Sequence, residues 1–270
     1  MVLVCGLAIG MEPATAQETS SSAAPNTRKA GERLVKTVDG IEYAFRWCPA
    51  GKFFMGSPNS EKVRKRNETR HEVTLSHGFW MLETEVTQAM WKSLMFERVS
   101  DKAPLGTFDH EVNSEGPVFP MYYVNWNECR EFCRRLAGKL GMEIALPTEA
   151  QWEYACRAGT TGRFAGDLDA MAWYLDNSEQ RTHAVAQKQP NAWGLYDMHG
   201  NVDEWCQDWY RESLSDSVTD PAGAETGYFR VARGGSWCLG PLYSRSAGRS
   251  CFVPDYRSHS LGFRVVSSTP

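Results

Sequence analysis

The sequence predicts an α+β domain with little regular secondary structure and two or three helices. Short segments with the alternation of β-strands come first, segments with helical periodicity follow, and strands and helices do not alternate along the chain. Beyond Gly159 the chain consists of short aromatic segments separated by Gly, Asn, Asp and Pro. The chain also has ten Trp residues, whose indole N–H groups need partners when they are buried. A loop-rich fold suits this composition better than a helical bundle.

The first part of the domain is expected to form short β-strands. Between Tyr43 and Gly56, β-type residues lie on both sides of a Pro49-Ala50-Gly51 turn, a pattern typical of a hairpin. Residues 71–75 and 79–82 predict two further strands.

Up to three helices are expected, and each follows a residue that can cap its N-terminus. Thr87 precedes the first helix, whose apolar residues share one face. Asn125 with Glu128, and Thr148 with Gln151, form capping-box patterns before the second and third helices. Because a capping box satisfies backbone N–H groups of the first turn, these pairs predict where the two helices begin.

The charge pattern argues against a nucleic-acid interface. The net charge is -4, and the dense basic stretch at residues 62–66 is followed closely by Glu68, so no extended phosphate-binding face is visible. The six histidines form no pair at metal-ligand spacing. We expect a monomer that does not bind nucleic acid.

Residues 1–16 have the pattern of a signal peptide. An apolar run from residue 2 to residue 11 precedes Ala14-Thr15-Ala16, a small-x-small cleavage pattern. The run is too short to cross a bilayer, so no integral membrane span is expected. Residues 17–33 are rich in Ser, Ala and Thr and are expected to be a flexible linker. We therefore expect an exported protein whose single domain covers residues 34–268.

Several segments, in order along the chain, resemble the formylglycine-generating enzyme family, also called sulfatase-modifying factors. They are Pro49–Ser57, Glu83–Thr87, Pro120–Trp126, Leu146–Tyr154, Pro190–Trp205, Arg233–Trp237 and Leu261–Arg264. The resemblance implies the family's fold, a C-type-lectin-like variant with limited regular secondary structure.

The resemblance also implies an activity. The best known members oxidise a cysteine of sulfatases to formylglycine with molecular oxygen and a copper(I) ion, which two active-site cysteines hold; soft thiolates select Cu(I). Cys238 lies near the position of the first of these cysteines, and Ser236 resembles the family's active-site serine. The second cysteine has no counterpart, because Tyr243 stands five positions beyond Cys238 in a loop that is shorter than in the classical enzymes. Ser236 is equally compatible with a role as a turn cap.

The remaining cysteines leave several arrangements open. Cys251 could act as a second copper ligand beside Cys238, or form a disulfide with Cys238 or with Cys156, or remain a buried thiol. Cys133 and Cys156 match the family's first disulfide partners, but their usual mates fall at Val265 and near Ser246.

The segment from Asn201 to Trp205 resembles the family's calcium loop. The resemblance implies Ca2+ ligands from Asn201, Val202 and Glu204, since hard cations prefer oxygen donors. The alternative is a loop in which Asn201 and Glu204 bond to the backbone. Asp203 departs from the family, which usually has a large residue at this position.

Two functions follow. The first is an oxidoreductase that acts on a cysteine of a sulfatase or another peptide. The second is a binding module of C-type-lectin-like fold that holds a peptide, glycan or partner protein without turnover.

Overall fold

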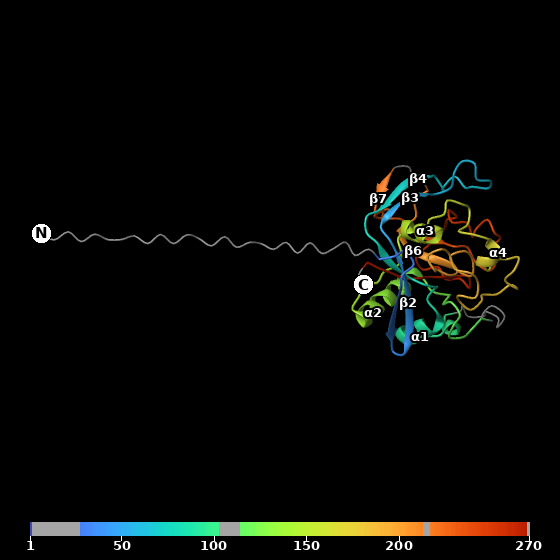
Figure 1. The fold of residues 1–270 in the computed structure, drawn as a ribbon. Coiled ribbons are helices and arrows are strands. Elements are labelled where there is room, and N and C mark those ends of the chain that lie inside the picture. Colours follow the sequence, from blue (N-terminus) through green and yellow to red (C-terminus); the bar gives the residue numbers. More distant parts are fainter. Residues whose placement is uncertain (2–27, 103–113, 213–216, 269–270) are drawn as a thin grey trace.

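The computed structural model describes Met1 and residues 28–102, 114–212 and 217–268. These residues form three small sheets and a few helices joined by long loops (Figure 1). The predicted α+β class with limited regular structure is confirmed. The predicted signal peptide and most of the predicted linker lie outside the described residues. Residues 28–33 are part of the domain, because the Gly31 N–H donates to the Trp47 carbonyl at 2.9 Å and the first strand begins at Arg33. The domain therefore begins slightly before the predicted boundary.

The first sheet joins both ends of the domain. It has the order β1 (Arg33–Val38), β2 (Ile41–Cys48), β5 (Phe79–Leu82) and β11 (Val266–Ser267), with antiparallel pairing throughout. Its inner face packs on the larger of two hydrophobic cores, together with the first two helices.

The second sheet carries the candidate site. Its order is β10 (Leu261–Gly262), β6 (Asp203–Trp209), β8 (Arg230–Arg233) and β9 (Ser250–Phe252). β10 runs parallel to β6, and the other pairs are antiparallel. β6 and β8 are almost completely buried, so the loops that precede β6 and follow β8 are held on a rigid base.

The third sheet corrects one prediction. It has the order β3 (Gly51–Met55), β4 (His71–Leu75) and β7 (Val218–Thr219). The expected strands on either side of Pro49-Ala50-Gly51 both exist, but they do not form a hairpin. β2 pairs with β1 and β5 in the first sheet, whereas β3 pairs with β4, so the turn leads from one sheet to another.

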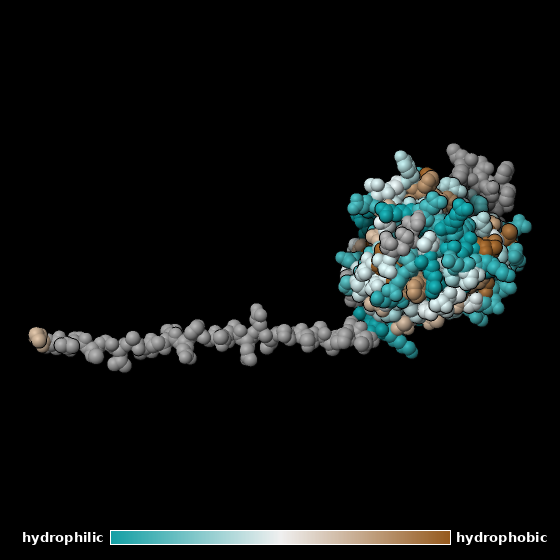
Figure 2. Space-filling model, turned by 90° about the horizontal axis from the view of Figure 1, so that it is seen from above, coloured by the Kyte–Doolittle hydropathy of each residue, from teal (hydrophilic) through white to brown (hydrophobic). Residues whose placement is uncertain are grey.

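The helices begin where the caps predict. Thr87 caps α1 (Gln88–Met95), Asn125 caps α2 (Trp126–Leu140) and Thr148 caps α3 (Glu149–Arg157), and both predicted capping boxes form. A one-turn helix, α4 (Leu168–Met171), and a 3-10 turn at Val99–Asp101 were not predicted. No helix of the described residues is long and apolar enough to cross a membrane. The face in Figure 2 carries mostly hydrophilic side chains with scattered hydrophobic ones.

Candidate active site

Two loops of the second sheet are hydrogen-bonded to each other and define the candidate site. The Gly200 N–H donates to the Gly234 carbonyl at 2.8 Å, and the Trp237 N–H donates to the Asn201 carbonyl at 3.0 Å. The Gly235 N–H donates to a carboxyl oxygen of Asp203 at 3.0 Å. The first residue of β6 and the loop that precedes it thus fix the backbone of residues 234–237.

Gly235 has no room for a side chain. Its φ is +72°, and a Cβ atom would lie 2.7 Å from the Ser244 Oγ. Glycine is therefore required both by the backbone conformation and by the close approach of the next part of the loop.

Cys238 and Ser236 lie side by side on this loop. The Ser236 Oγ is 3.5 Å from the Cys238 Sγ; Ser236 is buried, whereas Cys238 is partly exposed. Trp237, between them, is held on both sides, because its carbonyl accepts from the Ser178 Oγ at 2.8 Å and its indole N–H donates to the His259 carbonyl at 3.3 Å. The arrangement presents one thiol to solvent from a loop that is otherwise anchored.

A stacked pair that the sequence did not predict borders the loop. The rings of Trp173 and His183 are nearly parallel with centroids 3.7 Å apart, and the ammonium group of Lys188 lies 4.2 Å from the Trp173 ring. The pair is tied to the site through Asn201, whose N–H donates to the Trp173 carbonyl at 2.7 Å and whose Oδ1 accepts from the His183 N–H at 3.0 Å. Burial lowers the pKa of His183. The two residues are ten positions apart in a loop, and no local pattern indicates their contact.

The thiols present do not fit a two-cysteine copper(I) site. Between Gly234 and Ser250 the sequence has one cysteine, Cys238. Cys251 lies in β9 opposite Val231, and it is a free thiol like Cys238. Burial raises the pKa of Cys251, which opposes formation of the thiolate that binds copper. Tyr243, five positions beyond Cys238, is exposed and offers no soft donor.

The side chains of the predicted calcium loop are occupied by other partners. Both oxygens of Glu204 accept hydrogen bonds from Arg264 at 2.7 Å, and one of them also accepts from the Trp152 indole N–H at 2.7 Å. The Asn201 amide donates to Glu85 and accepts from His183. As these side chains stand, they do not fit a Ca2+ site with Val202. The alternative of bonds to the backbone holds for Asn201, which bonds to the His183 backbone, but not for Glu204, whose partners are side chains. The calcium assignment stays a prediction.

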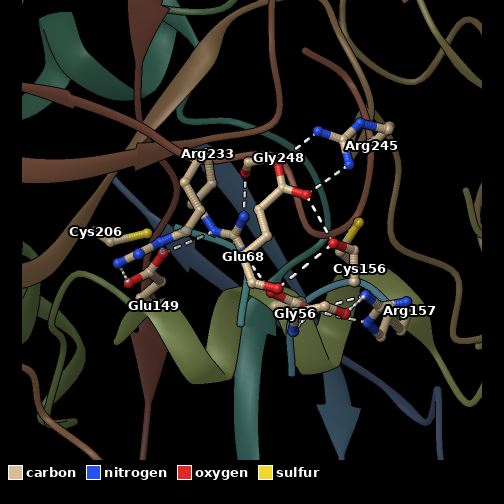
Figure 3. A network of polar contacts seen from close by, with 12 residues as sticks. Gly56, Glu68, Glu149, Cys156, Arg157, Cys206, Arg233, Arg245 and Gly248 are labelled. Atoms are coloured by element: carbon tan, nitrogen blue, oxygen red, sulfur yellow. Dashed lines mark hydrogen bonds and ion pairs between the residues drawn. The ribbon is translucent and has the colours of Figure 1, made fainter. Parts of the chain in front are cut away.

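Buried ion pairs connect α3 to the strand that leads into the site loop (Figure 3). The Glu153 carboxylate bonds to Arg157 at 2.8 Å and to Arg233 of β8. Glu149 contacts Arg233 at 3.4 Å and Arg249 at 2.6 Å. Arginine is suited to such sites because its guanidinium group makes several charge-assisted hydrogen bonds at once.

A further buried pair holds the short loop after Cys238. The Arg245 guanidinium bonds to Glu68 at 2.5 Å and to Glu61 at 2.8 Å, and it points toward the Glu68 carboxylate in Figure 3. Arg245 is fully buried. This pair fixes the loop to the segment between β3 and β4.

The five buried cysteines of the described chain are free, and one of them faces its expected partner position. They are Cys48, Cys129, Cys133, Cys156 and Cys206. Burial raises the pKa of Cys156 to about 12, and the neighbouring Ser246 hydroxyl partly offsets this shift. Cys133 and Val265 belong to one hydrophobic core. Ser246 thus lies beside Cys156, at the place where the family resemblance puts one missing disulfide partner, and Val265 shares a core with Cys133.

Replacing Ser246 by Cys is expected to create a disulfide with Cys156. The closed loop would be long, so the cross-link should stabilise the fold by about 2–4 kcal/mol. The free thiols of the oxidised Ser246→Cys variant are titrated in denaturant, and their number should equal that of a Cys156→Ser variant. The unfolding midpoint of the oxidised Ser246→Cys variant should rise above that of the wild type. Unchanged thiol reactivity after mild oxidation would show that the two side chains cannot meet.

The buried carboxyl group of Asp208 is expected to make the free energy of unfolding depend on pH. Its carboxyl group accepts from the Glu149 N–H at 2.8 Å, and burial together with the Glu149 charge raises its pKa from 3.8 to about 7. Because the folded-state pKa is the higher one, this contribution to stability is complete below pH 3.8 and is lost as the pH rises through 7.

Replacing Asp208 by Asn should remove this dependence. The amide oxygen keeps the bond to Glu149 and carries no charge. The unfolding free energy of the wild type should fall, relative to the variant, by up to about 1.4 kcal/mol per pH unit between these two pKa values. Denaturant unfolding at several pH values measures the difference, and a constant difference would contradict the assignment.

The fold and the site define a class of protein. Its members are loop-rich α+β domains with a partly exposed thiol two residues after a Gly-Gly-Ser turn. The profile described as "Sulfatase-modifying factor enzyme 1-like domain" matches residues 40–269. The formylglycine-generating enzyme of Streptomyces coelicolor is 30% identical over 94% of each chain, and that of Mus musculus is 36% identical over 81% of this chain and 73% of the mouse protein. The chain belongs to the sulfatase-modifying-factor family.

Solved structures agree with this assignment. PvdO from Pseudomonas aeruginosa superposes with a TM-score of 0.77 at 28% identity and covers 89% of this chain and 99% of its own. Treponema denticola variable protein 1 superposes with a TM-score of 0.76 at 29% identity, covering 87% of this chain and 99% of its own.

Proposed function

We propose that the protein converts a cysteine of a sulfatase-type peptide to formylglycine, with Cys238 as the thiol that contacts the substrate. In the net reaction the thiol-bearing methylene of the substrate becomes an aldehyde, sulfur leaves as hydrogen sulfide, and one dioxygen molecule supplies the aldehyde oxygen and one water. Two further electrons and two protons come from an external thiol reductant. Family membership supports this chemistry at a general level, because two relatives that this chain matches over most of their length are named formylglycine-generating enzymes.

The single observation that carries the proposal is the Ser236–Cys238 pair. The thiol is partly exposed, its neighbour Ser236 is buried at 3.5 Å, and hydrogen bonds to the start of β6 and to the loop before it fix the backbone. A positioned thiol next to a hydroxyl can hold a substrate thiol near the loop surface. No step is assigned to copper here, since the donor set does not supply two thiolates.

The experiment is a mass measurement on purified protein. The protein is incubated with a sulfatase-type cysteine peptide, oxygen and a thiol reductant, with and without added Cu(I). Conversion to formylglycine lowers the peptide mass by about 18 Da. We expect this loss with the wild type and with Cys251→Ser, and not with Cys238→Ser. Cys251→Ser is the matched control because, among the described residues, Cys251 is the other partly exposed thiol.

An unmodified peptide, under conditions in which the Streptomyces coelicolor enzyme modifies it, would overturn the oxidase proposal. Measuring the binding of the peptide to the protein then tests the second function, that of a binding module. Saturable binding without a mass change would identify a binding module.

A further inference from the structure

Arg230 of β8 is stacked between two tryptophans beside a cavity that shares no residue with the Cys238 loop. Its guanidinium carbon lies 3.6 Å from the Trp126 ring centroid and 3.4 Å from that of Trp209. The two indole rings are nearly parallel, with centroids 6.4 Å apart. Arg130 of α2 also stacks on Trp126, at 5.0 Å.

Arg230 and Arg130 form no ion pair with a described carboxylate. This distinguishes Arg230 from the buried arginines of the same domain, each of which lies within 4 Å of a Glu: Arg157, Arg233, Arg245, Arg249 and Arg264. One Arg230 N–H donates to the Gln207 carbonyl at 2.7 Å, but its Nε is buried without a hydrogen-bond partner. A buried donor without a partner is costly, and more so when it is charged.

The surroundings of Arg230 destabilise its charged form. Burial and the charge of Arg130 together lower the pKa of Arg230 to about 10, and the charge of Asp208 offsets this only in part. Stacking on indole rings recovers some of the energy, since the ring faces attract cations. The two guanidinium groups nonetheless remain two positive charges without a counter-charge in contact.

The cavity beside this stack has room for a ligand. Its volume is about 730 Å³, and its charged lining residues are Arg130, Arg134, Glu143, Glu225 and Arg230. Arg134 is already paired with Glu131 at 2.7 Å, and Glu143 accepts from the Ser268 hydroxyl. Glu225 is exposed at the rim. Among the cations that line the cavity, the two stacked arginines are therefore the ones without an ion pair to a described carboxylate, and the carboxylates of Glu143 and Glu225 line the same cavity.

We propose that this cavity binds a small oxyanion, a carboxylate, sulfate or phosphate group, through the guanidinium groups of Arg130 and Arg230. Such groups are matched by guanidinium N–H donors, and a bound anion would supply the missing counter-charge. Trp126 and Trp209 hold the Arg230 plane in place, so little conformational freedom is lost on binding. The inference is independent of the chemistry proposed for Cys238.

The test compares anions at constant ionic strength on the full folded protein. Sodium sulfate, sodium phosphate and citrate are each titrated in a calorimeter, with chloride as the balancing salt because sulfate also stabilises proteins by exclusion. At least one anion should bind saturably to the wild type. Saturable sulfate or phosphate binding would indicate a tetrahedral ligand, and citrate binding alone would indicate a carboxylate.

Two variants locate the site. Arg130→Gln, an exposed position whose loss should not disturb folding, is expected to weaken binding about tenfold or more, because a hydrogen bond to a charged group is lost. Arg70→Gln is the matched control, since Arg70 is also exposed and stacks on an aromatic ring, that of Phe54, outside the cavity. It should leave the affinity unchanged.

The absence of saturable binding with all three anions would overturn the proposal. Equal weakening by Arg130→Gln and Arg70→Gln would also overturn it, because the effect would then reflect net charge and not the cavity.

Discussion

Replacing Arg264 by Met is expected to lower the free energy of unfolding by about 3–5 kcal/mol. Arg264 is fully buried, and its guanidinium group makes two bonds of 2.7 Å to Glu204 and further bonds to backbone carbonyls, including that of Tyr196 at 2.9 Å. Removing it leaves the Glu204 carboxylate buried without its cation, in the neighbourhood of the acidic groups of Glu85 and Asp197. Denaturant unfolding at neutral pH measures the loss.

The control for this prediction is Arg181→Met. Arg181 is paired with Glu179 at 2.8 Å, but both side chains are largely exposed, so no measurable change is expected. A double variant, Arg264→Met with Glu204→Leu, should recover part of the stability because no unpaired charge is then buried. Equal stability of Arg264→Met and the wild type would contradict the role of this pair.

Replacing Glu153 by Gln is expected to have a similarly large effect. Burial alone would raise the pKa of Glu153, but the charges of Arg157 and Arg233 hold it below its usual value. Its carboxylate also accepts from the Gly56 N–H at 2.8 Å. The neutral amide would leave Arg157 without the carboxylate to which it is bonded, at a cost of about 3–5 kcal/mol in unfolding free energy.

The pH dependence gives an independent check on Glu153. A carboxyl group with a lowered pKa stabilises the fold above its unfolded-state pKa, and this contribution is lost as the pH falls through the folded-state value. The difference between the wild type and Glu153→Gln should therefore shrink in acid. Glu72→Gln, which removes an exposed pair with Lys52, is the matched control and should show little difference at any pH.

The local signals of the sequence were sufficient for the helices. Thr87, Asn125 and Thr148 each accept a bond from a backbone N–H three residues on, which is decided by neighbouring residues alone. The hairpin prediction at Pro49-Ala50-Gly51 was wrong because strand pairing is not decided by neighbouring residues alone. Which strand pairs with β2 depends on β5, some thirty residues further along the chain, and the turn between β2 and β3 carries no information about that distant partner.

The candidate site was predictable in part. The glycine pair before Ser236 and Cys238 indicates a tight turn, and the structure has positive φ at both glycines. The ion pairs beneath the loop were not predictable, because Glu and Arg ordinarily lie on the surface and a buried position is revealed only by its partner in space. The Trp126–Arg230–Trp209 stack is of the same kind, since its members come from α2, β8 and β6.

The position of β11 has a consequence for how the chain folds. Val266 and Ser267 pair with β5, so the sheet that starts at Arg33 is completed by almost the last described residues. Contacts between such distant parts of a chain make folding slow, because a large loop must close before they form. During synthesis the first sheet cannot be completed until Val266 and Ser267 have left the ribosome. A shortened chain that ends before Val266 should consequently remain a substrate for chaperones and proteases.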